Sequence, residues 1–208
     1  MIIQTKNIGI EISGKTIFSN ISLEINPNEM IAITGPSGSG KTTLLNCLGL
    51  IQSVNNGDIL IENQNASQWK EKEKISFWKD KAAFIYQDYG IIEDENVSYN
   101  VTLNKRQAKT QVVDEILHTV GLGGRGHDMA AVLSGGEKQR LGVARAIYKK
   151  ATIIFADEPT ASLDQSNREI IINLLRKCSE NGASVIIATH DERLVSVCDR
   201  SINLKPFM

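Results

Sequence analysis

A short segment early in the chain combines glycines with a lysine and a hydroxyl side chain. Residues 35–42 read Gly-Pro-Ser-Gly-Ser-Gly-Lys-Thr, which matches the G-x-x-x-x-G-K-[ST] pattern of a loop that binds phosphate. The apolar residues 30–33 precede it as a predicted buried strand, and residues 43–50 follow it as a predicted helix. Such a turn directs several backbone N–H groups at one point, where the helix N-terminus adds positive potential. We therefore expect a site for the phosphates of a nucleotide.

Individual residues of this loop have chemistry of their own. Lys41 is expected to reach the β- and γ-phosphates, and the Thr42 hydroxyl is expected to bind Mg²⁺. The three glycines allow the backbone to close around an anion without a clash from a Cβ atom. A glycine-rich strand-to-helix turn without a ligand is the alternative, but it requires a chance match to the whole pattern. The predicted nucleotide contacts are Gly35, Pro36, Ser37, Gly38, Ser39, Gly40, Lys41, Thr42 and Thr43.

Two adjacent carboxylates end a second apolar segment. Residues 152–156 predict a buried strand, and Asp157-Glu158 follow it directly. Sites in parallel sheets lie at the carboxyl ends of the strands, so both acids are expected beside the phosphate loop. Asp157 is placed to assist Mg²⁺, and Glu158 to take the proton of an attacking water as a general base. A solvated acidic turn is the alternative.

A third motif begins a predicted helix. Residues 133–137 read Leu-Ser-Gly-Gly-Glu, in which Ser134 and Glu137 form an S-x-x-E capping box at the start of helix 136–149. The structural role does not exclude a functional one. A capped helix start with two glycines also exposes N–H donors to an anion.

Composition places the chain among globular proteins. It has 208 residues, of which 41% are hydrophobic and 23% charged. The net charge of −1 gives no indication of a nucleic-acid-binding surface. Cys47, Cys178 and Cys198 are far apart in apolar helical patterns, which favours buried free thiols in a reducing cytosol. The N-terminus has no signal-peptide pattern and no apolar run is long enough to cross a bilayer, so we expect a protein that is soluble on its own.

The remaining sequence alternates strand and helix patterns. The expected strands are residues 2–12, 16–25, 29–34, 57–61, 82–86, 152–156, 184–188 and 201–204. The expected helices are residues 43–50, 70–80, 97–103, 110–120, 136–149, 165–178 and 191–197, with 121–132 as a glycine-rich connector. The first two strands, joined at Ser13-Gly14, predict an antiparallel hairpin. The later alternation predicts an α/β core with a parallel, doubly covered sheet. Residues 94–150 hold no strand pattern, which indicates an inserted helical subdomain.

Taken together, these motifs resemble the nucleotide-binding subunit of an ATP-binding-cassette (ABC) transporter, over nearly the whole chain. The motifs that carry the resemblance, in the family's order, are the phosphate loop 35–42, Gln87 as the Q-loop glutamine, the signature Leu133 to Glu137, Asp157-Glu158, the D-loop Ser162-Leu163-Asp164 and the switch histidine His190. The resemblance implies the fold of a P-loop NTPase of the RecA-like class in one domain, 1–208. Its α/β core with an N-terminal antiparallel β subdomain would comprise 1–87 and 151–208, and its helical subdomain 88–150.

The resemblance also implies a mechanism. Two subunits would form a homodimer head to tail around two ATP molecules with Mg²⁺. Each site would take its phosphate loop from one subunit and its signature from the other, so that Ser134, Gly135, Gly136 and Glu137 serve the partner's ATP. Glu158 would polarise the attacking water, and His190 would contact the γ-phosphate. Gln87 would reach the Mg²⁺ and water, and Asp164 would link the two sites.

One position departs from the family pattern. An aromatic residue usually stacks on adenine just before the Gly-Lys of the first hairpin, and this chain has Ile12 there. An aliphatic contact lacks ring stacking, which leaves selectivity for ATP over GTP open. Phe18 is the nearest aromatic substitute. His118 and His127 lie outside any motif and are interpreted as surface residues.

The wording around Gln87 favours one branch of the family. Phe84-Ile85-Tyr86-Gln87, with Asn96-Val97 downstream, resembles the lipoprotein-release and macrolide-exporter branch, and residues 87–92 look most like bacteriocin-export subunits. The implied partner is a separate transmembrane permease that docks on residues 88–97, which would place the protein in the cytoplasm at the inner face of the cell membrane. Export of peptides or lipophilic compounds is the preferred hypothesis. An importer fed by a solute-binding protein and mechanical signalling to a cell-wall enzyme are the alternatives.

Overall fold

A five-stranded parallel sheet forms the centre of the computed structural model, which describes residues 1–108 and 110–205. Its order is β10-β4-β9-β8-β7, and every pairing in it is parallel. The strands are β4 (Met30–Thr34), β7 (Ala82–Ile85), β8 (Ile153–Asp157), β9 (Ser184–Ala188) and β10 (Arg200–Asn203). The central strands are continuous apolar runs because both faces of the sheet are covered.

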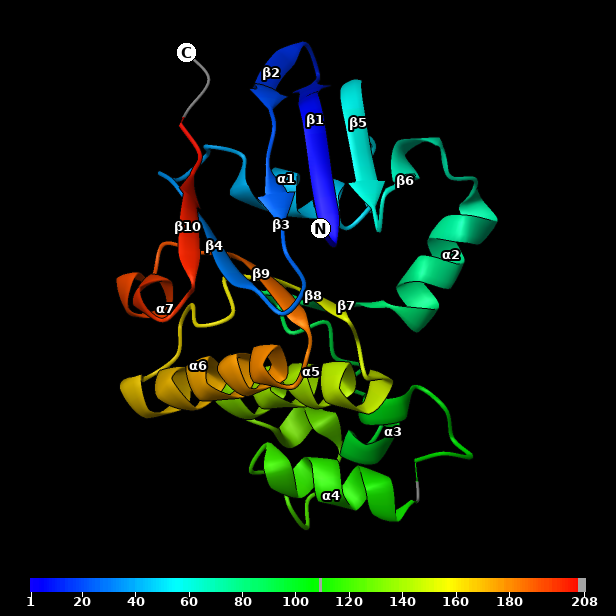
Figure 1. The fold of residues 1–208 in the computed structure, drawn as a ribbon. Helices are drawn as coiled ribbons and strands as arrows, with labels where there is room; N and C mark the ends of the chain where they lie inside the picture. The colour runs from blue at the N-terminus through cyan, green and yellow to red at the C-terminus, as the bar shows by residue number, and fades with distance from the viewer. Residues whose placement is uncertain (109, 206–208) are drawn as a thin grey trace.

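A second, antiparallel sheet lies on one side of the parallel sheet (Figure 1). It consists of β1 (Ile3–Ile12), β2 (Lys15–Ile21), β3 (Glu24–Ile25), β5 (Asn56–Ile61) and β6 (Gln64–Asn65). Ser13 and Gly14, which join β1 to β2, both have positive φ, 51° and 77°, as a two-residue hairpin turn requires. The predicted hairpin is confirmed, except that its second strand breaks after Ile21 and β3 pairs with the opposite end of β1.

Helices complete the fold. They are α1 (Lys41–Leu48), η1 (Ala66–Gln68), α2 (Glu71–Asp80), α3 (Val97–Thr102), α4 (Gln111–Thr119), η2 (Ala130–Val132), α5 (Gly135–Lys149), α6 (Gln165–Glu180) and α7 (Glu192–Ser196). Each predicted helix is confirmed within about two residues, the usual uncertainty of helix ends. The sequence did not predict η1, β6 or η2, each of which is three residues long or shorter.

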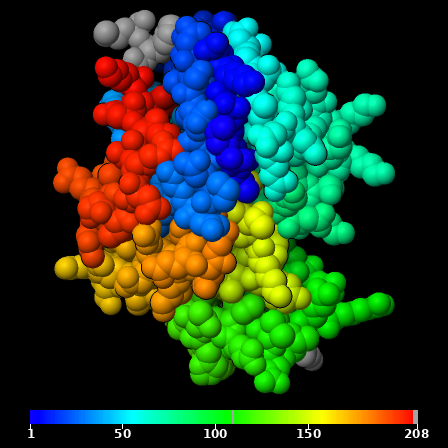
Figure 2. All heavy atoms as spheres, viewed as in Figure 1, coloured from blue at the N-terminus to red at the C-terminus, as the bar shows by residue number. Residues whose placement is uncertain are grey.

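Two hydrophobic clusters hold these layers together. One lies between the parallel sheet, α1 and the antiparallel sheet, and includes Phe18 and Phe155. The other joins the opposite face of the parallel sheet to α3, α4, α5 and α6, and includes Val97 and Leu141. The second cluster therefore spans residues of both the α/β core and the segment 88–150, whose division into subdomains stays a prediction. In space-filling view the residues of α3 and α4 form the lower end of the molecule (Figure 2).

The fold confirms the α/β, P-loop NTPase class, and it also fixes where chemistry can occur. The phosphate loop follows β4, Gln87 follows β7, Asp157 and Glu158 end β8, and His190 follows β9. Parallel strands bring these positions to the same edge of one sheet.

Candidate functional site

The phosphate loop depends on glycine at its two most crowded positions. Gly35 has φ 144° and Gly40 has φ 90°. A Cβ atom at Gly35 would lie 2.4 Å from the backbone oxygen of Leu204, and one at Gly40 would lie 2.7 Å from Cγ2 of Ile17. Lys41 lies across the loop, where its ammonium donates to the carbonyl oxygens of Gly35 at 3.0 Å and Pro36 at 3.3 Å. The loop therefore curves tightly, and it carries the positive charge of the Lys41 ammonium.

The donor set of the phosphate loop fits a magnesium nucleotide. Oγ of Ser39 is buried and has no hydrogen-bond partner among the described residues, so a polar group in the loop is available to a ligand. The Thr42 hydroxyl donates to Oδ1 of Asp157 at 3.0 Å, which brings two oxygen ligands for a hard cation together. In the described part of the chain no group of three or more His, Cys, Asp and Glu side chains could hold a metal ion. The Thr42 hydroxyl and the Asp157 carboxylate suit Mg²⁺, which binds through one or two protein ligands and completes its shell with phosphates and water.

Electrostatics at Asp157 also reflect its place beside the loop. Burial raises the pKa of the Asp157 carboxyl, the hydrogen bond from Thr42 lowers it, the charge of Glu158 raises it and Lys41 lowers it; the net direction is upward. A divalent cation would oppose that increase, because it stabilises the charged carboxylate.

Glu158 and His190 form a pair at the ends of β8 and β9. Nδ1 of His190 lies 2.8 Å from Oε1 of Glu158. The imidazole is 72% exposed and the carboxylate only 13%, so the histidine reaches outward while the glutamate is held inside. Glu158 has the left-handed φ of 44°, and its N–H donates to the carbonyl of Ala188 at 2.8 Å. The predicted base and the predicted switch residue are thus in direct contact.

Gln87 is exposed at the end of β7 and lines a shallow pocket together with Asp157, Tyr86 and Asp88. The loop after it is tied down from two sides. Asn100, which is fully buried, accepts from the N–H of Ile92 at 2.8 Å and donates to the carbonyl of the same residue at 2.9 Å. Arg145 donates to the carbonyl of Gly90 at 2.9 Å. This loop is therefore held to α3 and α5.

The signature forms the expected capped helix start. Oγ of Ser134 accepts from the N–H of Glu137 at 3.4 Å, and the Glu137 carboxylate accepts from the N–H of Ser134 at 2.8 Å. The hydrogen bond from the Ser134 backbone is the main cause that lowers the pKa of Glu137. Arg125 pairs with the same carboxylate at 2.6 Å, so the glycine-rich connector is anchored to the start of α5.

Within one chain, the signature and the phosphate loop are not brought together. Among the described residues, no hydrogen bond or ion pair joins residues 134–137 to residues 35–43. The main packing partners differ as well: α5 packs on α3, α4, α6 and β7, whereas α1 packs on β8 and β9.

Asp164 caps α6 by accepting from the N–H of Asn167 at 2.9 Å, and that hydrogen bond is the main cause that lowers its pKa.

Isolated residues outside the motifs differ in their exposure to solvent. Phe18 is only 2% exposed in the core of the antiparallel layer, so the prediction that it could replace the adenine-stacking aromatic is wrong. Ile12 is 39% exposed at the end of β1 and is free to meet a ligand. His118 and His127 are exposed, as predicted. Cys47 and Cys178 are buried free thiols, and Cys198 is half-buried.

Other residues of the site gave no signal in the sequence. Thr189 contacts the Glu158 carboxylate, and Asn167 bonds to Asp164 and to Arg140. Tyr89 packs against Gly135, where a Cβ atom would lie 2.5 Å from its hydroxyl oxygen. Apart from Asp164 and Asn167, which belong to the same helix start, no spacing rule links these pairs, because the two members of each belong to different parts of the fold.

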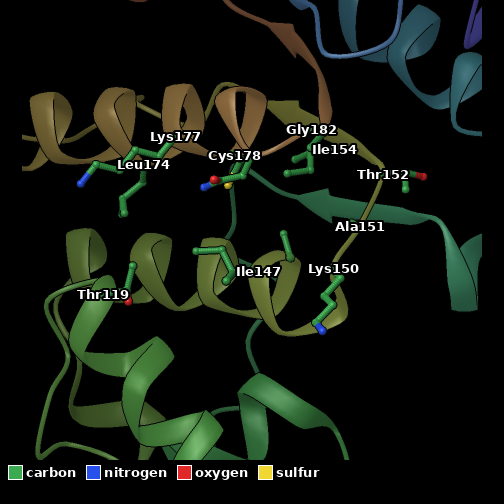
Figure 3. A pocket seen from close by; sticks show the side chains of 13 residues that line it. Thr119, Ile147, Lys150, Ala151, Thr152, Ile154, Leu174, Lys177, Cys178 and Gly182 are labelled. Atoms are coloured by element: carbon green, nitrogen blue, oxygen red, sulfur yellow. The ribbon is translucent and has the colours of Figure 1, made fainter.

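An apolar groove lies elsewhere, between α5 and α6 (Figure 3). Ile147 of α5 and Leu174 and Cys178 of α6 line it. None of the residues predicted to bind nucleotide borders it. It is separate from the candidate site.

Comparisons with known proteins agree with this geometry. A family model described as ABC transporter matches residues 18–161. The lipoprotein-releasing system ATP-binding protein LolD of Shewanella denitrificans is 34% identical over 196 residues, which cover 91% of this chain and 84% of that protein. The macrolide export ATP-binding/permease protein MacB of Escherichia coli is 35% identical over 201 residues, 90% of this chain but only 31% of that protein.

Solved structures give the same result. The dimeric, post-hydrolysis structure of the ATP-binding cassette MJ0796 bound to ADP and Pi superposes with a TM-score of 0.88 at 28% identity, covering 99% of this chain and 97% of that chain. A second dimeric structure of MJ0796, described as a bacterial ABC transporter cassette, has the same TM-score at 30% identity.

Proposed function

Because this chain belongs to the ABC transporter family, we propose that it is the ATP-binding and ATP-hydrolysing subunit of a transporter of the LolD and MacB type. The observation that carries the proposal is the convergence of four strand ends. The phosphate loop after β4, the exposed Gln87 after β7, the Asp157 and Glu158 pair at the end of β8 and His190 after β9 meet at one edge of the sheet.

Each residue has a defined task in hydrolysis. The loop N–H groups and Lys41 hold the β- and γ-phosphates, and Ile12 lies against the base. Thr42, Asp157 and Gln87 would hold Mg²⁺, which when bound would neutralise charge on the phosphates. Glu158 takes a proton from water while the water oxygen bonds to the γ-phosphorus and the bond from that phosphorus to the bridging oxygen of ADP breaks. His190 donates to the γ-phosphate oxygens, where negative charge is held in the transition state.

A second copy of the chain completes each site. The signature of one chain lies at the N-terminus of α5, a 15-residue helix, and among the described residues no hydrogen bond or ion pair joins it to the phosphate loop of its own chain. In the dimer, Ser134, Gly135, Gly136 and Glu137 face the γ-phosphate bound by the partner, and Asp164 lies between the two sites. The dimeric cassettes that this chain resembles support the arrangement.

A separate transmembrane permease would couple hydrolysis to transport. Among residues 1–108 and 110–205, no helix has the length and apolar character needed to cross a bilayer. The protein would therefore act in the cytoplasm, bound to the inner face of the membrane through the permease, with residues 88–150 as its helical subdomain. The preferred cargo is a peptide of the bacteriocin type or a lipophilic compound, and identification of a co-purified permease would test this.

Replacement of the proposed base tests the central claim. We expect Glu158→Gln to retain ATP binding, to lose steady-state hydrolysis and to accumulate as an ATP-bound dimer in size-exclusion chromatography, because the carboxamide cannot accept the proton. Glu180→Gln, at the exposed C-terminal end of α6, is the matched control. Normal hydrolysis by Glu158→Gln would remove Glu158 from the base role.

A further inference from the structure

We propose that Thr189 is a positioning residue for hydrolysis: its hydroxyl fixes the orientation of the Glu158 carboxylate. The proposal rests on the role of Glu158 given above. Thr189 directly follows β9 and is completely buried. None of the sequence motifs of the site includes it.

The direction of the Thr189 hydrogen bond follows from its partners. The N–H of Asp191 donates to Oγ1 of Thr189 at 3.0 Å. Since a hydroxyl has a single proton and that N–H occupies an acceptor position on its oxygen, the proton is free for Oε2 of Glu158, which lies 3.2 Å away. Hydrogen bonds to a carboxylate are stronger than neutral ones.

The other side-chain contact of the carboxylate comes from an exposed group. Nδ1 of His190 touches Oε1 at 2.8 Å, and the N–H of His190 lies 3.4 Å from Oε2. The imidazole is largely exposed, and in the proposed mechanism it serves the γ-phosphate. When the ring turns to the phosphate, the buried Thr189 hydroxyl is the side-chain contact that continues to hold Glu158.

Asp191, in turn, fixes Thr189 in place. Oδ1 of Asp191 accepts from the N–H groups of Arg193 at 3.0 Å and Leu194 at 3.3 Å, as the N-cap of α7. Its Oδ2 accepts from the hydroxyl of Thr160 at 2.7 Å and lies 3.4 Å from Nε of Arg168. The backbone N–H that meets Thr189 is therefore held by three separate elements.

These hydrogen bonds begin and end in the same loop, the one that follows β8. Thr160, Asp191, Thr189 and Glu158 are linked in that order, and Thr160 lies only two positions after Glu158 in the sequence. Glu158 has a left-handed backbone conformation, which is unfavourable for a residue with a Cβ atom and persists where surrounding contacts fix it. The surrounding contacts thus fix both the backbone and the side chain of Glu158.

Removal of the hydroxyl alone tests the proposal. We expect Thr189→Val to lower kcat for ATP hydrolysis about 10-fold or more, the effect of one hydrogen bond to a charged group. The KM and the Kd for ATP should stay within about twofold, because the Thr189 hydroxyl contacts Glu158 and Asp191 and none of the proposed phosphate-binding groups, and Thr189→Ser should restore kcat. A Thr189→Val protein with the kcat of the unmodified protein would overturn the proposal.

A matched control separates orientation from stability. Thr5 in β1 is also buried, donates to the carbonyl of Ile21 at 3.1 Å and accepts from the N–H of Leu23 at 3.0 Å. Thr5→Val should thus lower the melting temperature to a similar extent without a change in kcat. If Thr189→Val does not fold, Thr189→Ala and Thr189→Ser give a second pair that differs by a hydroxyl, and equal kcat values for that pair would also overturn the proposal.

Failure of this inference differs from failure of the proposed function. An inactive Glu158→Gln together with a fully active Thr189→Val would leave the base in place and remove only the role of Thr189. An active Glu158→Gln would remove both.

Discussion

At the scale of single residues, the site places charged side chains where they are partly buried. Asp157 illustrates the cost of this arrangement. It is partly withdrawn from water, which raises its pKa, and only a hydrogen bond from Thr42 and the charge of Lys41 oppose that effect. The carboxylate is therefore suited to its proposed ligand rather than to the stability of the free protein.

The stability of the folded chain should depend on the charge state of Asp157. Because the pKa of Asp157 is higher in the folded than in the unfolded state, the unfolded chain releases its proton first as pH rises, and the free energy of unfolding falls over that range. At neutral pH the loss is complete. We expect Asp157→Asn to raise the melting temperature at neutral pH without Mg²⁺, and the gain to shrink as pH is lowered toward 3.8, the ordinary value.

Calorimetry with and without Mg²⁺ checks this prediction. Asp94→Asn, which alters an exposed aspartate, should leave the melting temperature unchanged. A lower melting temperature for Asp157→Asn at neutral pH would show that the hydrogen bond from Thr42 outweighs desolvation. The same variant should lose Mg²⁺-dependent hydrolysis.

At the scale of elements, Asn100 of α3 makes several of the hydrogen bonds that hold the loop after Gln87. Asn100 bonds to both backbone groups of Ile92 and also donates to the carbonyl of Asn96 at 3.1 Å. We expect Asn100→Ala to cost roughly 1–3 kcal/mol, because it leaves buried backbone groups unsatisfied. Hydrogen exchange of residues 88–96 should accelerate.

Asn104, which is exposed and accepts from the N–H of Arg106, provides the control. Asn104→Ala should leave exchange of residues 88–96 as it is in the unmodified protein. Unchanged protection of that loop in Asn100→Ala would mean that Arg145 and the packing on α5 suffice to hold it.

Elements were predictable from the sequence where the signal is local. The strand before the phosphate loop, the loop itself and the capping box at Ser134 can each be recognised within a few consecutive residues. Phe18 could not be placed, because the β1–β2 ladder shifts register on either side of Ile10, the residue with which Phe18 pairs, and one such shift changes the face on which a side chain lies. Thr189 was missed because its partner Glu158 follows a different strand, and Asn100 was missed because a contact with the backbone eight residues earlier follows no spacing rule.

At the scale of the whole molecule, the separation of signature and phosphate loop can be tested with two inactive variants. Lys41→Ala damages the loop, and Ser134→Ala damages the signature; each alone should give a dimer with two defective sites. In a mixed dimer, the intact loop of one chain meets the intact signature of the other. We expect the mixture to regain up to about a quarter of normal ATPase activity, because half of the dimers are mixed and each has one good site of two.

Titration of one variant into the other, followed by phosphate release, measures this. The activity should pass through a maximum near equal amounts of the two chains. A mixture as inactive as its components would show that the two motifs do not act across a dimer.

The crowded contact between Gly35 and Leu204 has a consequence for biosynthesis. Strand β4 pairs on one side with β9 and on the other with the edge strand β10, and the carbonyl oxygen of Leu204 lies against Gly35. The phosphate loop leaves the ribosome early, whereas β9 and β10, the two strands that pair with β4, are translated late. A nascent polypeptide must therefore wait for its last strand before it can capture nucleotide.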